Sequence, residues 1–158
     1  MLVVTFRVAA AAYAIRSDQV LAVIPQVELR PIAHRSSWLK GVFAYRGELT
    51  PVVDLCQLIG SYPCPERLSS RVALVRCGTP EGGLRTLGLL AEHMTEARRL
   101  ETQLTTASPL TAAPYLGDVV LEGSEPLQFL KVDAILPSAG LLLTEGLTGE
   151  KDREPTQP

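Results

Sequence analysis

The sequence predicts an all-β protein made of two similar small barrels packed together, with short helices between strands. Twelve glycines and twelve prolines in 158 residues favour a chain with many turns. Residues 38–60 have the pattern of a strand, a tight turn at Arg46 and Gly47, a second strand and a short helix. Residues 115–136 repeat that order in weaker form, which indicates a duplicated hairpin unit.

The strands of the first half are predicted from short runs rich in β-branched and aromatic residues. They are expected at residues 2–8, 13–16, 20–24, 27–30, 41–46 and 49–53. An alanine-rich turn joins the first two strands, where glycine or asparagine is usual. Ser17 is expected to cap a single helical turn, and Asp54 a short helix that ends near Gly60.

The second half repeats the elements of the first in the same order. Strands are expected at residues 71–77 and 86–90, joined by a glycine-rich tip at 78–85, and again within 115–136. Residues 13–20 and 87–94 agree in residue type at eight positions. Two glycines with equal spacing belong to each hairpin, namely Gly41 and Gly47, then Gly117 and Gly123.

The chain is expected to fold as one unit over residues 1–143. Its first barrel unit covers about 1–62 and its second 70–137, and strands can exchange between the two. The connection between them is rich in proline. Residues 144–158 lack apolar side chains almost entirely, which predicts a disordered tail.

Composition excludes several classes of partner. The net charge is −2 and the basic residues are not clustered, so nucleic acid is not the expected partner. No run of eighteen apolar residues occurs, so no membrane insertion is expected and a cytoplasmic location is predicted. A small barrel that binds single-stranded nucleic acid stays open as an alternative, although only eight aromatic residues are available for stacking.

The three cysteines do not have the spacing of a disulfide framework or a zinc site. Cys56, Cys64 and Cys77 contain no C-x-x-C pair, and His34 and His93 stand apart from them in the sequence. Buried, reduced thiols are the expected state. A small hydrolase or metal enzyme that uses these histidines and cysteines remains the other alternative.

No sequence motif indicates catalysis. G-x-S-x-G, the phosphate-binding loop and the dinucleotide fingerprint are all missing from the sequence. Asp54 and Asp133 each follow an apolar strand, so we expect both to be helix N-caps, with the second helix stopped by Pro137. We therefore expect no catalytic residue, no metal and no cofactor.

The turn at Arg46 has the composition of a protein-binding site. Arg46 follows Tyr45 and lies three residues from Phe43 on the predicted hairpin. Arginine beside aromatic residues on a rigid element is typical of interaction hot spots. An ordinary turn arginine without a partner is the competing interpretation.

Residues 41–55 resemble the central pattern of the CheW family, the coupling proteins of bacterial chemosensory arrays. The matching positions are Gly41, Val42, Arg46, Gly47, Pro51, Val52, Val53, Asp54 and Leu55. A weaker resemblance extends over residues 2–137. It implies two five-stranded, SH3-like barrels with pseudo-symmetry and no catalytic activity.

The resemblance also implies partners. Such proteins join the cytoplasmic tip of a chemoreceptor to the regulatory domain of a CheA-type histidine kinase, and they assemble in rings with other CheW-like proteins. In this family the receptor hairpin lies in the groove between the barrels, near the Arg-Gly turn. The expected partner-binding residues are Gly41, Val42, Phe43, Tyr45, Arg46 and Gly47.

Three positions depart from the family pattern. Ala44 replaces an asparagine before the turn, Cys56 replaces a basic residue, and Ala22 replaces an acidic one. These departures count against coupling to the standard motility receptors. The segment from Trp38 to Gly47 is closer to coupling proteins of alternative systems, and the surface-sensing Wsp type, whose output is cyclic-di-GMP synthesis, is the preferred subfamily.

Overall fold

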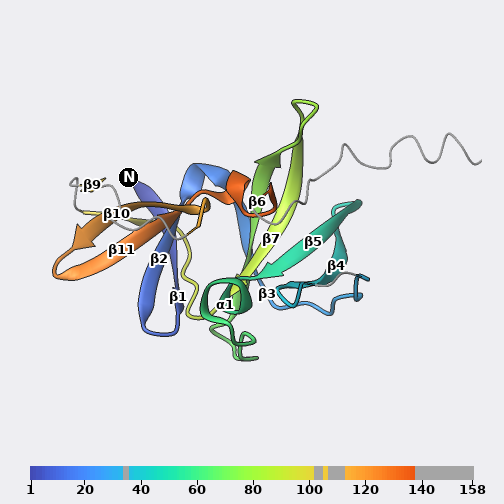
Figure 1. Ribbon diagram of the computed structural model, residues 1–158, viewed down its shortest axis with the longest axis horizontal. Helices are drawn as coiled ribbons and strands as arrows, with labels where there is room; N and C mark the ends of the chain where they lie inside the picture. Colours follow the sequence, from blue (N-terminus) through green and yellow to red (C-terminus); the bar gives the residue numbers. More distant parts are fainter. Residues whose placement is uncertain (34–35, 102–104, 107–112, 138–158) are drawn as a thin grey trace, which may run out of the picture.

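The computed structural model describes residues 1–33, 36–101, 105–106 and 113–137. Within these residues the chain forms two β-sheets, one drawn mainly in dark blue and orange and one mainly in teal and green, together with short helices (Figure 1). The prediction of an all-β protein with two packed barrel units is confirmed. The predicted tail at 144–158 lies outside the described residues.

The first sheet has six strands in the order β8-β1-β2-β11-β10-β9. Their bounds are β1 Leu2–Val8, β2 Ala11–Arg16, β8 Arg98–Arg99, β9 Thr105–Thr106, β10 Leu116–Glu122 and β11 Glu125–Leu130. Two of the six, β8 and β9, are only two residues long, which explains why the sequence pattern did not predict them.

The second sheet has five strands in the order β3-β6-β7-β5-β4. Their bounds are β3 Val20–Pro25, β4 Leu39–Tyr45, β5 Glu48–Asp54, β6 Arg71–Gly78 and β7 Leu84–Ala91. Three short helices complete the chain, namely the 3₁₀ helix η1 at Ser17–Gln19, α1 at Leu55–Gly60 and the 3₁₀ helix η2 at Val132–Ala134. None of the helices in the described part of the chain has the length and hydrophobicity needed to span a membrane.

The two sheets have the same plan. Each contains two antiparallel hairpins joined by one parallel pair, β2 with β11 in the first sheet and β7 with β5 in the second. Each sheet takes one hairpin from each half of the sequence. Strands β1 and β2 therefore pair with the late hairpin, whereas β4 and β5 pair with β6 and β7 from the second half.

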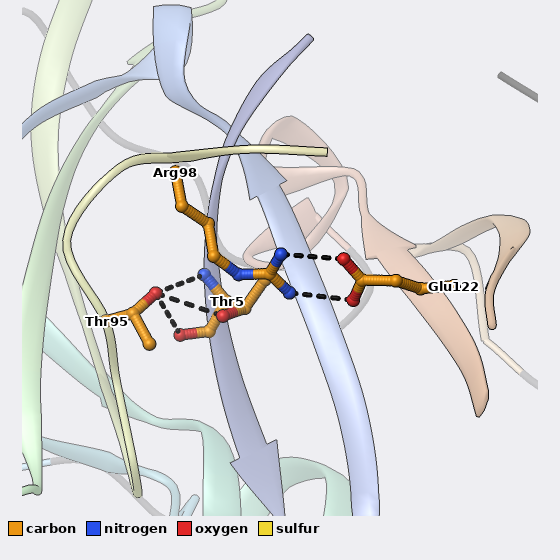
Figure 2. Close-up of polar contacts among 4 residues, drawn as sticks. All are labelled: Thr5, Thr95, Arg98 and Glu122. Carbon is orange, nitrogen blue, oxygen red and sulfur yellow. Dashed lines mark hydrogen bonds and ion pairs between the residues drawn. The ribbon is translucent and has the colours of Figure 1, made fainter. Parts of the chain in front are cut away.

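The six-stranded sheet curls into a barrel. Strands β8 and β10 are four places apart in the sheet, a separation of about 19 Å if the sheet were flat. Arg98 on β8 nevertheless forms a two-pronged salt bridge with Glu122 at the end of β10, with N–O distances of 2.7 and 2.8 Å (Figure 2). Only a curved sheet brings these two side chains together.

The five-stranded sheet curls in the same way. Arg30, beyond the end of edge strand β3, exchanges two backbone hydrogen bonds with Val42 on the opposite edge strand β4, at 2.8 and 2.9 Å. Residues 27–30 were predicted to be a strand, and this prediction is wrong. Only the single bridge at Arg30 forms, because the chain leaves the sheet after Pro25.

Strand β1 contributes to two hydrophobic clusters. Val4, Phe6 and Val8 belong to the large cluster that includes the interior of the five-stranded sheet. Val3 belongs to a smaller cluster with residues of β2, β10 and β11. Because alternate residues of a strand face opposite sides, one strand fills its own barrel and also packs against the neighbouring one.

A polar junction also connects the two barrels. Arg7 N–H on β1 donates to the backbone oxygen of Glu92, just beyond β7, at 2.9 Å. The Tyr62 hydroxyl accepts a hydrogen bond from Ala9 N–H at 2.7 Å and donates to the Glu92 carboxylate. Tyr62 follows α1 and Ala9 lies in the β1–β2 turn, so this junction links both sheets.

The structure confirms one of the two predicted aspartate N-caps and contradicts the other. Asp54 is the N-cap of α1 and accepts from Cys56 N–H and Gln57 N–H, as expected. Asp133 lies inside η2, whose N-cap is Lys131, and its carboxylate accepts from Gly78 N–H on β6. The prediction for Asp133 is wrong, and so is that for Ser17, which is the first residue of η1 and makes no cap hydrogen bond.

The hairpin register explains the error at Asp133. Tyr45 pairs with Glu48 around one turn, and Glu122 pairs with Glu125 around the other. Gly123 is therefore the structural equivalent of Arg46. The glycine spacing had instead aligned Gly123 with Gly47, one position further along the chain. Counted from the turn, the equivalent of Asp54 is the cap residue of η2 and not Asp133.

Candidate protein-interaction surface

The β4–β5 hairpin ends in a two-residue turn that presents Arg46 to solvent. Arg46 has a φ of 52° and Gly47 a φ of 80°. Positive φ at both central residues is the geometry of a type I′ turn, which matches the twist of paired strands. Glycine accepts this conformation freely, whereas arginine adopts it at some cost. The turn therefore holds Arg46 at a defined place on the surface.

The Arg46 side chain lies over the Tyr45 ring, which in turn contacts Phe43. Phe43 and Tyr45 lie on the same face of β4, with ring centroids 6.3 Å apart in an edge-to-face arrangement. The Arg46 guanidinium carbon lies 5.2 Å from the centroid of the Tyr45 ring, within the range of a cation–π contact. Both rings are half-buried and pack against the large core cluster. Arg46 is thus positioned over a ring that the core holds in place.

Glu48 anchors the base of the turn to the neighbouring strand. Its carboxylate accepts from Arg85 Nε–H at 2.7 Å and from Thr86 N–H at 3.0 Å, both on β7. Burial raises the pKa of Glu48, but the hydrogen bonds from Thr86 and Arg85 outweigh it, so the pKa lies below its ordinary value. An ionised Glu48 therefore fixes the hairpin at neutral pH and leaves Arg46 as the cation that projects from the turn.

Gly41 and Val42 lie at the other end of β4. Gly41 is buried beside a register shift in the β4–β5 pairing, and a side chain there would approach the Arg30 carbonyl oxygen to 2.6 Å. Val42 is half-buried and bonds through its backbone to Arg30. The structure thus gathers Phe43, Tyr45, Arg46 and Gly47 near the turn, while Gly41 and Val42 serve strand packing.

Two exposed leucines lie at the same end of the sheet as the turn and were not predicted from the sequence. Leu49 pairs with Ala44, so it lies on the face of the hairpin opposite Phe43 and Tyr45. Leu49 on β5 is 52% exposed and Leu84 at the start of β7 is 55% exposed. Because β5 and β7 are parallel neighbours that start together, both leucines lie at the same end of the sheet. Sequence spacing gave no signal for them, since the pairing of β5 with β7 joins segments from different halves.

The residues of the alternative enzyme hypothesis do not form one site. His93 lines a cavity of about 410 Å³ beside Thr5, Thr95 and Arg98, and no cysteine lines that cavity. Cys56 and Cys64 lie together with Asp54, buried at α1. His34 lies outside the described residues. A histidine–cysteine pair for catalysis is therefore not present among the described residues.

The Asp54, Cys56 and Cys64 group brings three potential metal ligands within 4.8 Å of one another. The Asp54 carboxylate, however, already accepts three backbone hydrogen bonds, from Cys56, Gln57 and Cys64. These hydrogen bonds cap α1 and anchor the loop that follows it, so they explain the burial of the Asp54 carboxylate without requiring a cation. The sequence had not predicted that Cys64 would join Cys56, because seven residues, including the remainder of α1, lie between the two.

Comparison with known proteins agrees with this architecture. The CheW-like domain model matches residues 2–140. Among solved structures, the scaffolding protein TtCheW from Thermoanaerobacter tengcongensis superposes with a TM-score of 0.76 at 18% sequence identity, covering 90% of this chain and 91% of that one. The search for similar curated proteins found no match.

The fold defines a paired, SH3-like barrel protein whose halves exchange strands. Since the family model spans nearly the whole chain, the protein belongs to the CheW-like domain family. This is a family of chemotaxis scaffold proteins that are not enzymes.

Proposed function

We propose that this protein is a non-enzymatic adaptor that couples a chemoreceptor to a CheA-type histidine kinase. The family match carries the proposal. The receptor contributes its cytoplasmic tip and the kinase its regulatory domain, and further CheW-like proteins join the assembly in rings. The protein acts in the cytoplasm, where it is recruited to membrane-associated receptor arrays.

The receptor-binding surface comprises the β4–β5 hairpin and its surroundings, namely Gly41, Val42, Phe43, Tyr45, Arg46 and Gly47. Arg46 makes the central contact, supported by its exposure, its position above Tyr45 and the rigid turn. Among the described residues it makes no salt bridge, so its charge is available to a carboxylate or a helix C-terminus on the partner.

The replacement Arg46→Glu should abolish receptor binding. A hot-spot residue contributes about 2 kcal/mol or more, which corresponds to a loss of affinity of about thirtyfold or greater. The measurement is pull-down and titration of a soluble receptor fragment with the purified protein. The free energy of unfolding should change by less than about 0.5 kcal/mol, because the side chain is exposed.

A second replacement separates the charge from the turn. Arg46→Asn creates Asn-Gly, the preferred sequence of a type I′ turn, and removes the guanidinium. It should weaken binding while leaving the hairpin at least as stable. Arg76→Glu, at an exposed position on β6, serves as the charge-matched control and should bind normally. Unchanged receptor binding by both Arg46 variants would show that the site is elsewhere.

The subfamily is part of the proposal. The departures at Ala22, Ala44 and Cys56 favour an alternative chemosensory system, with the surface-sensing Wsp type preferred. A reconstituted assembly with receptors of the two types distinguishes them. Stronger kinase activation with motility receptors than with Wsp-type receptors would contradict the subfamily while leaving the adaptor role intact.

A further inference from the structure

Two cysteines form a buried pair at α1, away from the hairpin surface. Cys56 is the second residue of α1 and has 0% exposure, and Cys64 lies in the following loop with 4% exposure. Their sulfur atoms lie within 4.8 Å of each other. Both are free thiols in the structure. Formation of a disulfide requires the two sulfur atoms to approach to about 2 Å.

A single carboxylate holds the backbone of both cysteines. Asp54 Oδ1 accepts from Cys56 N–H and Oδ2 accepts from Cys64 N–H, each at 3.0 Å. The two residues therefore keep their separation even though one lies in α1 and the other in the loop that follows it. Neither depends on the other sulfur for its position, so the pair is preorganised in the reduced protein.

The two thiols are chemically different. A hydrogen bond from Cys64 lowers the pKa of Cys56 below its ordinary value. The same contact with Cys56 raises the pKa of Cys64, as burial also does. Cys56 is therefore the better nucleophile, and Cys64 stays protonated beside it. This is the arrangement of an attacking thiol and a resolving thiol.

The third cysteine has neither a thiol partner nor a donor to its sulfur among the described residues. The Cys77 thiol donates to the Val132 carbonyl oxygen at 3.8 Å. Burial, with the Asp133 charge nearby, raises the pKa of Cys77 to about 12. Cys77 is therefore an internal control for the reactivity of a buried thiol in this protein.

We propose that Cys56 and Cys64 are a redox modification site that forms an intramolecular disulfide on exposure to a peroxide. The Cys56 thiolate attacks one peroxide oxygen, the O–O bond breaks, and the departing oxygen leaves as water after taking a proton. The Cys64 sulfur then attacks the Cys56 sulfenic acid, the S–O bond breaks, and the second oxygen leaves as water with the Cys64 proton. Two thiols lose two electrons, and the peroxide gains them.

The cysteine pair lies beside the polar junction at Glu92 that connects the two barrels, so oxidation of Cys56 changes a contact at that junction. The Cys56 thiol lies 3.9 Å from the Glu92 carboxylate, which also accepts from Tyr62 at the junction. Disulfide formation removes the Cys56 S–H donor. A small oxidant gains access through local opening of the loop after α1, where Leu68 is 97% exposed.

Peptide mapping of the oxidised full-length protein tests the proposal. No lysine or arginine lies between Arg46 and Arg67, so trypsin releases Cys56 and Cys64 together on residues 47–67 and Cys77 on residues 77–85. The folded, reduced protein is treated with hydrogen peroxide, then alkylated and digested without reductant. The fragment 47–67 should be lighter by two hydrogen atoms and carry no alkyl group, while Cys77 is alkylated after unfolding.

Variants complete the test. Cys77→Ser should form the same internal disulfide as the unmodified chain, whereas Cys56→Ser and Cys64→Ser should not. Alkylation of both thiols on fragment 47–67 after peroxide treatment would overturn the proposal, as would a disulfide that forms only in urea. Stoichiometric zinc in the purified protein, protecting both thiols from alkylation, would assign the pair to a metal and also overturn it.

Discussion

Asp54 is the residue on which the local structure around α1 depends. Its buried carboxylate caps the helix through Cys56 and Gln57 and also fixes the loop through Cys64 N–H. The sequence predicted the cap, because an apolar strand gives way to a helix at this aspartate. It did not predict the third hydrogen bond, which depends on how the loop folds back.

Replacing Asp54 should be much more damaging than replacing Asp133. Asp54→Ala removes a helix cap, worth about 1 kcal/mol, and leaves the Cys64 amide buried without a partner, which costs about 1–3 kcal/mol more. The expected loss in the free energy of unfolding is about 2–4 kcal/mol by urea denaturation. Asp133→Ala should cost less than about 1 kcal/mol, because Asp133 is exposed and accepts from the exposed Gly78 N–H. Equal losses would contradict the structural difference between the two aspartates.

The β1–β2 turn shows how one element relies on another. Ala9 has a φ of 54°, a conformation that alanine rarely adopts. Ala9 N–H donates to the Tyr62 hydroxyl and the Ala10 carbonyl accepts from the Arg7 guanidinium, both from outside the turn. These contacts explain why alanines occupy a turn where the sequence rules favour glycine or asparagine.

The β4 strand should tolerate no side chain at Gly41. Its φ of 158° is a conformation that residues with a Cβ rarely adopt, and space is a second constraint, since a Cβ would lie 2.6 Å from the Arg30 oxygen and 3.0 Å from Leu29 Cβ. Gly41→Ala should reduce the free energy of unfolding by about 1–3 kcal/mol, the usual cost of overpacking. Gly78→Ala is the matched control, because nothing lies within 4 Å of its Cβ position and the change should stay within about 0.5 kcal/mol. Thermal and urea unfolding measure both, and equal stability of the two variants would contradict the close approach at Arg30.

At the scale of the whole molecule, side chains distant in sequence close the barrels and join them. Arg98 and Glu122 close the six-stranded barrel (Figure 2). The Tyr62–Glu92 contact joins the barrels through the β1–β2 turn. Shared packing of β1 in both hydrophobic clusters makes the two barrels one cooperative unit. We therefore expect a single unfolding transition for the chain.

Acid should weaken the Arg98–Glu122 salt bridge that closes the six-stranded barrel. The Arg98 guanidinium holds the pKa of Glu122 below its ordinary value of 4.5. A depressed folded-state pKa means that the stabilisation is complete above the unfolded value and is lost as the pH falls through the folded value. Glu122→Gln should lower the melting temperature at neutral pH and reduce the loss of stability on acidification. Glu81→Gln, at the exposed tip of the β6–β7 hairpin, is the control, and equal acid profiles for both variants would contradict this role of Glu122.

Local sequence patterns correctly predicted the longer strands and the main turn. They failed for elements whose formation depends on pairing with residues distant in the sequence. Strands such as β1 and β6 and the Arg46–Gly47 turn follow from residue type and turn chemistry. The two-residue strand β8 and the absence of a strand at 27–30 depend on pairing across the sheets. The sequence could group the proposed binding residues Phe43, Tyr45 and Arg46, because they lie within four positions on one hairpin. It could not predict that the exposed Leu49 and Leu84 lie at the same end of the sheet.

The sequence by itself determined the fold class, the duplicated hairpins and the helix that begins after Asp54, because these depend on residues near one another in the chain. Tertiary structure alone decided which hairpins share a sheet, where Glu92 meets Tyr62, and that Cys64 lies beside Cys56. The physical reason is that strand exchange and barrel closure depend on burial and hydrogen bonding between segments far apart in the chain. The local propensity of a segment does not specify which distant segment it pairs with.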